Sequence, residues 1–342
     1  MSVLSFKPNI VVDDLLSVLK ERNKDIISQR FGIGRKEEGK TLEEIGKKYG
    51  ITRERVRQII NFSLNTIKEN PIMERRKEAF EELKDNLEKR GKILSERDVL
   101  EHFSPEPISQ RYIYFLLVLG DEFKKFKEDE EFNHRWTIDE EFAHKVHNVL
   151  RDLHKEIREE DVIPEQEILN ILNKKIENIV RERVNEEILK LWLRLSRLIA
   201  NNPMGEWGLV SSPHINPRGV RDLIYLVMRK QKEPMHFTEA AEKIKEYFSK
   251  KVHLATVHNE LIKDPRFVLV GRGLYALKDW GYRPGITKEI IENIIRERGP
   301  LTKEEIVEAV LKERHIKENT ILINLHNRKY FRRDKDGRYA II

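Results

Sequence analysis

The chain of 342 residues carries 65 basic and 59 acidic side chains, giving a net charge of +6, with 39% hydrophobic residues and no cysteine. This composition excludes a disulfide framework and cysteine-ligated zinc, and it favours several small helical domains over one large sheet. No apolar run approaches membrane length and the N-terminus lacks a signal pattern, so we expect a cytoplasmic protein without a membrane partner.

The charge is distributed unevenly along the chain. Residues 1–73 carry 14 basic and 10 acidic side chains, whereas residues 74–217 carry 24 and 31. Residues 218–282 and 283–342 are again basic, with net charges of +5 and +4. A polyanion is attracted to the two ends and repelled by the middle. This pattern predicts DNA-facing ends and a central spacer or protein-docking section.

The first segment is helical up to a glycine-rich loop. Residues 10–31 predict a helical stretch with the core stripe Val12, Leu15, Leu16, Leu19, Ile26 and Ile27. Residues 32–40 form the loop, and Thr41 to Ile67 then predict two short helices. Between them Gly50 suits a left-handed turn, and Thr52 offers a hydroxyl cap to the second helix.

The second of these helices combines an apolar and a polar face. Its core-facing residues, at spacings of three and four, are Val56, Ile59, Ile60, Leu64 and Ile67. Its outward residues are Arg53, Glu54, Arg57 and Gln58. Arginine can fork onto guanine, glutamine onto adenine, and glutamate can accept from cytosine, so this face suits the major groove. The alternative is an ordinary solvated face of mixed charge.

The run TLEEIGKKYGITRERVRQI resembles the helix-turn-helix of region 4 in the bacterial sigma factor family. The preceding LLSVLKERNKDIISQRFGIG resembles the helices before that motif. The resemblance implies docking on the beta flap of the RNA polymerase core. It also implies phosphate contacts at Thr41 and Leu42, and promoter reading in double-stranded DNA by Arg53, Glu54, Arg57 and Gln58.

The chain departs from the sigma family after Gln58. Ile60, Asn61 and Phe62 stand where the family has an acidic and then a basic residue. This change puts one phosphate contact in doubt and adds apolar surface at Ile60 and Phe62 for packing on another part or a partner. The family's core-binding and promoter-melting helices have no counterpart, and the residues before 10 cannot hold them. We therefore expect a regulator or auxiliary factor.

Residues 74–140 predict a winged helix. A charged helix over 75–90 is followed by a short strand, a helix capped by Ser95, and the buried apolar helix Arg111 to Leu119. Lys124 to Ile138 then predict a hairpin. The acidic wing sequence EDEE is a poor clamp for phosphate, so we expect this domain to be structural or to face a protein.

Residues 141–217 show a nearly continuous helical pattern up to residue 200, with the stripe Val146, Leu150, Leu153 and Ile157. Ile188 to Leu198 predict a core helix, and Trp207 to Val210 a strand. His144 and His147 lack a third ligand at metal spacing, so we expect surface or packing histidines and no metal.

Residues 218–282 predict two helices and the hairpin FVLVGRGLYAL, and they resemble the HARE-type winged helix, also found in the delta subunit of some bacterial RNA polymerases. Val257 and Leu261 are expected in the core. The candidate nucleic-acid contacts are Thr256, Asn259, Lys263 and, on the wing, Arg272. Members of this family bind DNA or protein, and both readings stay open.

Residues 283–342 form a diverged copy of this domain. Eight positions, including Leu261 and Tyr275, recur 64 residues later as the same or a similar residue. The basic wing of the copy contains Arg332, Arg333, Lys335 and Arg338 around Asp336-Gly337. It suits phosphate, although a solvated basic hairpin is an equal alternative.

The sequence thus predicts a mainly α protein of tandem helix-turn-helix and winged-helix modules with short β-hairpin wings. The five modules comprise residues 1–73, 74–140, 141–217, 218–282 and 283–342. The leading function is a sequence-specific DNA-binding transcription factor associated with RNA polymerase; the alternative is a polymerase-docking factor with incidental DNA affinity. No phosphate loop, HExxH or nucleophile motif indicates an enzyme, so we expect no catalytic residue and no cofactor. Target sequence, direction of regulation and oligomeric state stay open.

Overall fold

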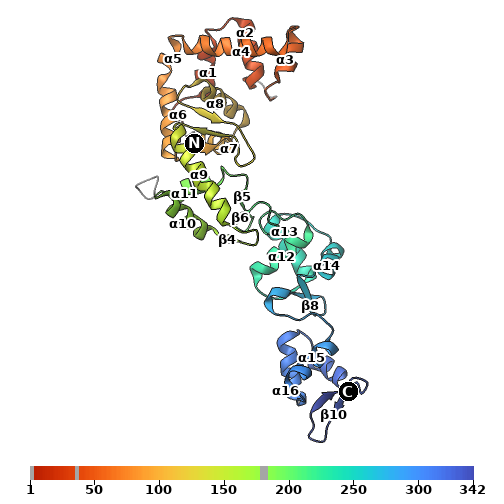
Figure 1. Cartoon of the computed structure of the whole chain (residues 1–342). Helices are drawn as coiled ribbons and strands as arrows, with labels where there is room; N and C mark the ends of the chain where they lie inside the picture. Colours follow the sequence, from red (N-terminus) through yellow and green to blue (C-terminus); the bar gives the residue numbers. More distant parts are fainter. Residues whose placement is uncertain (1–3, 35–37, 178–183) are drawn as a thin grey trace. The chain divides into compact units, whose positions relative to one another are not determined.

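The computed structural model describes residues 4–34, 38–177 and 184–342 (Figure 1). Most elements in these ranges are α-helices, and the strands form small sheets of two or three members, which confirms the mainly α fold class. The chain divides into two compact units, Met1–Ala200 with Trp207–Val210, and Asn201–Glu206 with Ser211–Ile342. Among the described helices, none has both the length and the apolar character needed to cross a membrane.

The first unit begins with five helices, α1 (Pro8–Leu16), α2 (Glu21–Phe31), α3 (Leu42–Tyr49), α4 (Arg53–Lys68) and α5 (Ile72–Arg75). The apolar stripe predicted over residues 10–31 is buried, but the helix itself is interrupted between α1 and α2. Ser17 ends α1 because its backbone N–H and its hydroxyl both donate to the carbonyl of Asp14. Competition of this kind from serine disfavours continuation of a helix.

A winged helix follows, formed by α6 (Lys77–Lys89), β1 (Ile93–Ser95), α7 (Glu96–Phe103), α8 (Pro107–Leu119), β2 (Lys124–Phe126) and β3 (Arg135–Thr137). Its sheet has the order β1-β3-β2, and Ser95 caps α7 as predicted. Helix α8 has the place of a recognition helix, yet it packs on α1 and shares one hydrophobic cluster with α1, α2 and α4. Because this apolar helix is buried, it cannot enter a DNA groove.

The rest of the first unit comprises α9 (Glu140–Glu156), β4 (Ile163–Pro164), α10 (Glu165–Ile176), α11 (Glu186–Leu193), β5 (Ile199–Asn201) and β6 (Glu206–Leu209). The prediction of nearly continuous helix here was wrong, because short strands in the order β4-β6-β5 interrupt it. His147 is buried, and its Nε2 accepts a hydrogen bond of 2.8 Å from Arg135 Nε. Burial, followed by the charge of Arg135, lowers the pKa of His147 to about 3, so its ring is a neutral packing group.

The acidic wing between β2 and β3 is held by basic side chains of this unit. Asp129 accepts from the buried guanidinium of Arg135 at 3.0 Å and from two backbone N–H groups. Glu131 pairs with Arg151 of α9 at 2.8 Å, and Arg197 donates to the Asp129 carbonyl at 2.8 Å. The acidic wing therefore joins the second and third predicted modules, which gives a physical reason for its charge.

The second unit contains two winged helices. The first comprises α12 (Val220–Gln231), β7 (Met235–His236), α13 (Phe237–Phe248), α14 (Leu254–Lys263), β8 (Phe267–Gly271), β9 (Leu274–Leu277) and the 3₁₀ turn η1 (Lys278–Trp280). The second comprises α15 (Thr287–Arg298), α16 (Lys303–Glu313), α17 (Glu318–Leu325), β10 (Phe331–Arg333) and β11 (Tyr339–Ile341). Their correspondence extends to pairing: Met235 lies opposite Tyr275, and Leu301 opposite Tyr339.

The two winged helices of the second unit are in contact. The backbone N–H of His315 donates to the carbonyl of Val270 in β8 at 2.7 Å. At Gly271 a Cβ would lie 2.6 Å from the carbonyl oxygen of His315, so only glycine allows this approach. Both the second unit's domains and the acidic-wing joint show that long-range contacts connect the five predicted modules, whose boundaries stay a prediction.

Candidate nucleic-acid interface

The turn between α3 and α4 is determined by local chemistry. Gly50 has a φ of 65°, the left-handed conformation that ends α3, and the hydroxyl of Thr52 accepts from the N–H of Arg55 at 3.2 Å. Gly46 is also required, since a Cβ there would lie 2.6 Å from the carbonyl oxygen of Ile51. These three residues determine the direction in which α4 leaves the turn.

A polar cluster around Asp25 connects α2 to α3. Its carboxylate accepts from Gln29 Nε2 at 2.7 Å, from Lys48 Nζ at 2.8 Å, and from the hydroxyl of Tyr49. Gln29 is fully buried, so these bonds are shielded from water on one side. Asp25 was not among the residues singled out from the sequence, because its partners on α3 are 23 and 24 residues away.

The exposed face of α4 contains the four residues predicted to read bases, Arg53, Glu54, Arg57 and Gln58. Glu54 accepts from Arg57 Nε at 2.9 Å and from Nη2 at 2.7 Å. This hydrogen bonding lowers the pKa of Glu54 and raises that of Arg57. The fork of Arg57 is thus held in one orientation by a carboxylate that DNA must displace or that docks with it.

Arg55 lies on the same face and was not among the predicted contacts. It is exposed, and its Nη1 donates to Gln58 Oε1 at 3.1 Å. Like Glu54 and Arg57, these residues are three apart, a spacing at which helix side chains meet. That spacing was the available signal, and the pairing adds one cation to the face.

The predicted apolar surface after Gln58 is only half present. Phe62 is 65% exposed, whereas Ile60 is 7% exposed and lies in the core of the first unit. The expectation that Ile60 adds docking surface was wrong, because its place on the helix repeats the apolar spacing of Val56 and Ile67. Phe62 is the large apolar side chain that α4 presents to solvent.

The residues predicted to meet phosphates at the start of α3 are already engaged. The N–H and hydroxyl of Thr41 donate to Glu44 at 2.8 and 2.7 Å, and Leu42 packs partly on the core. A phosphate here would have to replace the Glu44 carboxylate, which sits at the amide end of the helix. The role of Thr41 and Leu42 stays a prediction.

In the second unit, α14 presents Thr256, Asn259 and Lys263 to solvent, and Arg272 is exposed at the hairpin tip. The same helix also leaves Leu254 49% and Ile262 61% exposed. These two aliphatic side chains were not among the residues singled out from the sequence, although each lies outside the core spacing of Val257 and Leu261. The face is therefore chemically mixed.

The wing formed by β10 and β11 brings together four exposed cations, Arg332, Arg333, Lys335 and Arg338. Asp334 closes the turn by accepting from the N–H groups of Asp336 and Arg338 at 3.0 and 2.8 Å. Gly337 has a φ of 82°, and its carbonyl accepts from Arg333 Nε at 3.2 Å. The hairpin offers cations on both strands and on the turn between them.

The fold and these faces define a class: a chain of helix-turn-helix and winged-helix domains with exposed basic helices and wings. Comparison with known families assigns two of the domains. Residues 15–69 match the model of "Sigma-70, region 4", and residues 219–280 match that of HARE-HTH, described as an "ASXL, restriction endonuclease HTH domain". The matches place the chain with DNA-binding, transcription-related proteins, and neither family is enzymatic.

Curated relatives match in the first unit. The chain is 44% identical over 69 residues to the RNA polymerase principal sigma factor HrdD of Streptomyces griseus, over 20% of each protein. It is 44% identical over 57 residues to the RNA polymerase sigma factor RpoD of Helicobacter pylori, over 17% of this chain and 8% of that protein. The sigma factor SigA of a Bacillus species matches over 72 residues at 38% identity, covering 18% of its length. The chain thus spans a fifth or less of these relatives.

Proposed function

We propose that the protein is a sequence-specific, DNA-binding transcription factor in which α4 reads base edges of a promoter-like element. The observation that carries the proposal is the exposed face of α4, held outward by Gly46, Gly50 and Thr52. Its arginines, glutamine and glutamate are the side chains that distinguish base pairs in the major groove. The similarity to sigma factors supports promoter DNA as the target.

The proposal includes association with RNA polymerase in the cytoplasm. The relatives that match the first unit are named as RNA polymerase sigma factors, and in this chain Phe62 leaves an aromatic ring exposed on the same helix. The basic wing of the second unit then acts as a sequence-independent contact with phosphate, since its cations lie on an exposed hairpin.

An alternative rests on α14. Its exposed Leu254 and Ile262 are unusual neighbours for phosphate and favour a protein surface. In that case the second unit docks on polymerase, and DNA affinity is incidental. Salt separates the two, because affinity carried by several phosphate contacts falls steeply with added salt and an apolar interface does not.

The decisive experiment is selection of bound DNA from a random pool by the full chain, with and without core RNA polymerase. Enrichment of one short motif, lost in Arg57→Ala, supports base reading by α4. A pool that stays random under both conditions contradicts the proposal. Enrichment that needs polymerase supports a joint surface in which α4 reads DNA only within the assembly.

A further inference from the structure

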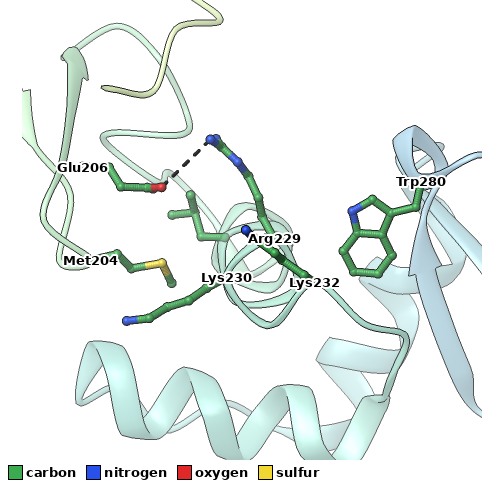
Figure 2. A pocket seen from close by; sticks show the side chains of 7 residues that line it. Met204, Glu206, Arg229, Lys230, Lys232 and Trp280 are labelled. Carbon is green, nitrogen blue, oxygen red and sulfur yellow. Dashed lines mark ion pairs between the residues drawn. The ribbon is translucent and has the colours of Figure 1, made fainter. Parts of the chain in front are cut away.

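The second unit contains a cavity of about 680 Å³ at the C-terminal end of α12. Figure 2 shows the side chains that line it, including Met204, Glu206, Arg229, Lys230, Lys232 and Trp280. They come from the strand region before α12, from the end of α12 and from η1. None of them belongs to α4, α14 or the basic wing, so the proposed DNA contacts do not explain the cavity.

The cavity carries excess positive charge. Its lining includes three cations and one carboxylate, and the only ion pair among these described residues joins Arg229 Nη2 to Glu206 Oε1 at 3.9 Å. The ammonium of Lys230 lies 4.3 Å from the ring centroid of Tyr247, which favours one orientation of that side chain. A concave site with two uncompensated cations attracts an anion.

Lys232 stands at a position where its backbone favours glycine. It caps α12 in the left-handed conformation with a φ of 60°, and its N–H donates to the carbonyl of Met228. An L-residue other than glycine costs about 1 kcal/mol in this conformation. Residues held in such conformations concentrate at functional sites, so the side chain of Lys232 is a candidate for use.

Trp280 supplies a flat apolar wall. Three of the four tryptophans, Trp136, Trp192 and Trp207, are at most 3% exposed, whereas Trp280 is half-buried. In Figure 2 its indole lies on the other side of the α12 end from Glu206. An accessible indole face beside cations is a stacking platform for an aromatic ring that carries negative charge.

We propose that this pocket binds a nucleotide, with the base stacked on Trp280 and the phosphate held by Arg229, Lys230 and Lys232. A free nucleotide and an unpaired nucleotide of a single strand share this chemistry. Base pairs within a duplex cover their faces by stacking, so intact double-stranded DNA is not the ligand. The site is separate from α4 and functions whether or not α4 reads promoter DNA.

Tryptophan fluorescence of the full-length protein tests the proposal, because Trp280 is the accessible indole. The titrants are adenosine monophosphate, a short single-stranded oligothymidylate and inorganic phosphate. Quenching by the monophosphate assigns a free nucleotide, and quenching by the oligonucleotide alone assigns a single strand. Failure of both nucleotide ligands to quench overturns the proposal, as does equal quenching by inorganic phosphate.

Matched variants test the lysine separately from the fold. Lys232→Gly restores the residue that the backbone prefers, so we expect unchanged or higher thermal stability together with about tenfold weaker nucleotide binding. Lys250→Gly removes the same charge from an exposed position outside the cavity and should leave binding unchanged. Equal loss in both variants would reduce the site to nonspecific charge and overturn the proposal.

A third pair separates stacking from packing. Trp280→Phe keeps an aromatic face and should retain measurable nucleotide binding, whereas Trp280→Leu should lose it, with binding followed by calorimetry. Full binding by the leucine variant would refute the stacking role. Arg57→Ala should bind the nucleotide normally, so failure of the promoter-reading proposal and failure of this one give different results.

Discussion

Helices α4 and α14 are the two candidate recognition helices, one in each unit, and their solvent faces differ in chemistry. The leading turns of α4 present charged and amide groups that pair with each other at a spacing of three residues. Helix α14 presents two exposed aliphatic side chains and the cation Lys263. The comparison indicates that similar helical domains in one chain are suited to different partners: base edges for α4, and a protein surface for α14.

The largest effect is expected from disturbing the turn that presents α4. Gly46→Ala places a Cβ 2.6 Å from the Ile51 carbonyl oxygen. We expect a loss of roughly 1–3 kcal/mol in the unfolding free energy of the first unit. Thermal unfolding and DNA binding by the full chain measure it. Gly50→Asn is the control, because asparagine tolerates the left-handed conformation; equal damage from both variants would show that the alanine effect is not steric.

The next effect tests whether α4 and α14 differ in reading bases. Arg57→Ala should cost about 1–3 kcal/mol on the preferred site and flatten discrimination at one base pair. Lys263→Ala on α14 should weaken binding to all sequences slightly and equally. Competition binding against single-base variants of the selected site measures both. A uniform loss in Arg57→Ala would remove the distinction between the helices.

A smaller, sequence-independent effect is expected at the basic wing. The double change Arg332→Ala and Arg338→Ala should lower affinity for every DNA and reduce the salt slope by roughly 2, about one for each phosphate contact. Substitution is preferable to deletion of residues 283–342, because the backbone of His315 pairs with β8. Titrations at several salt concentrations measure the slope. A shifted sequence preference would show that the wing reads bases.

The smallest effect on DNA binding is expected from the aliphatic side of α14. Leu254→Ser with Ile262→Ser removes two exposed apolar groups that lie outside the core. We expect unchanged DNA affinity and weaker capture of purified core RNA polymerase, measured by pull-down at high salt. If DNA affinity falls and polymerase capture is unaffected, then α14 is a second DNA-binding helix and the contrast with α4 is lost.

Features that depend on neighbouring residues were predictable from the sequence. The Gly50 turn, the Thr52 cap, the apolar spacing of α4 and the repeat of the last two domains all follow from residues close in the chain. The same reasoning located the exposed face of α4 that is proposed to read bases. It also predicted the acidic wing to be structural or protein-facing, and the structure shows this wing binding Arg135, Arg151 and Arg197.

Tertiary structure alone decided the remaining features, because they depend on contacts between residues far apart in the chain. The burial of α8 against α1, the Asp25 cluster and the joint at the acidic wing each connect separate elements. The pocket at Trp280 likewise combines side chains from residues 204–280. Local spacing sets which face of a helix is polar; only the packing of distant helices determines whether that face meets solvent, a neighbouring domain or a ligand.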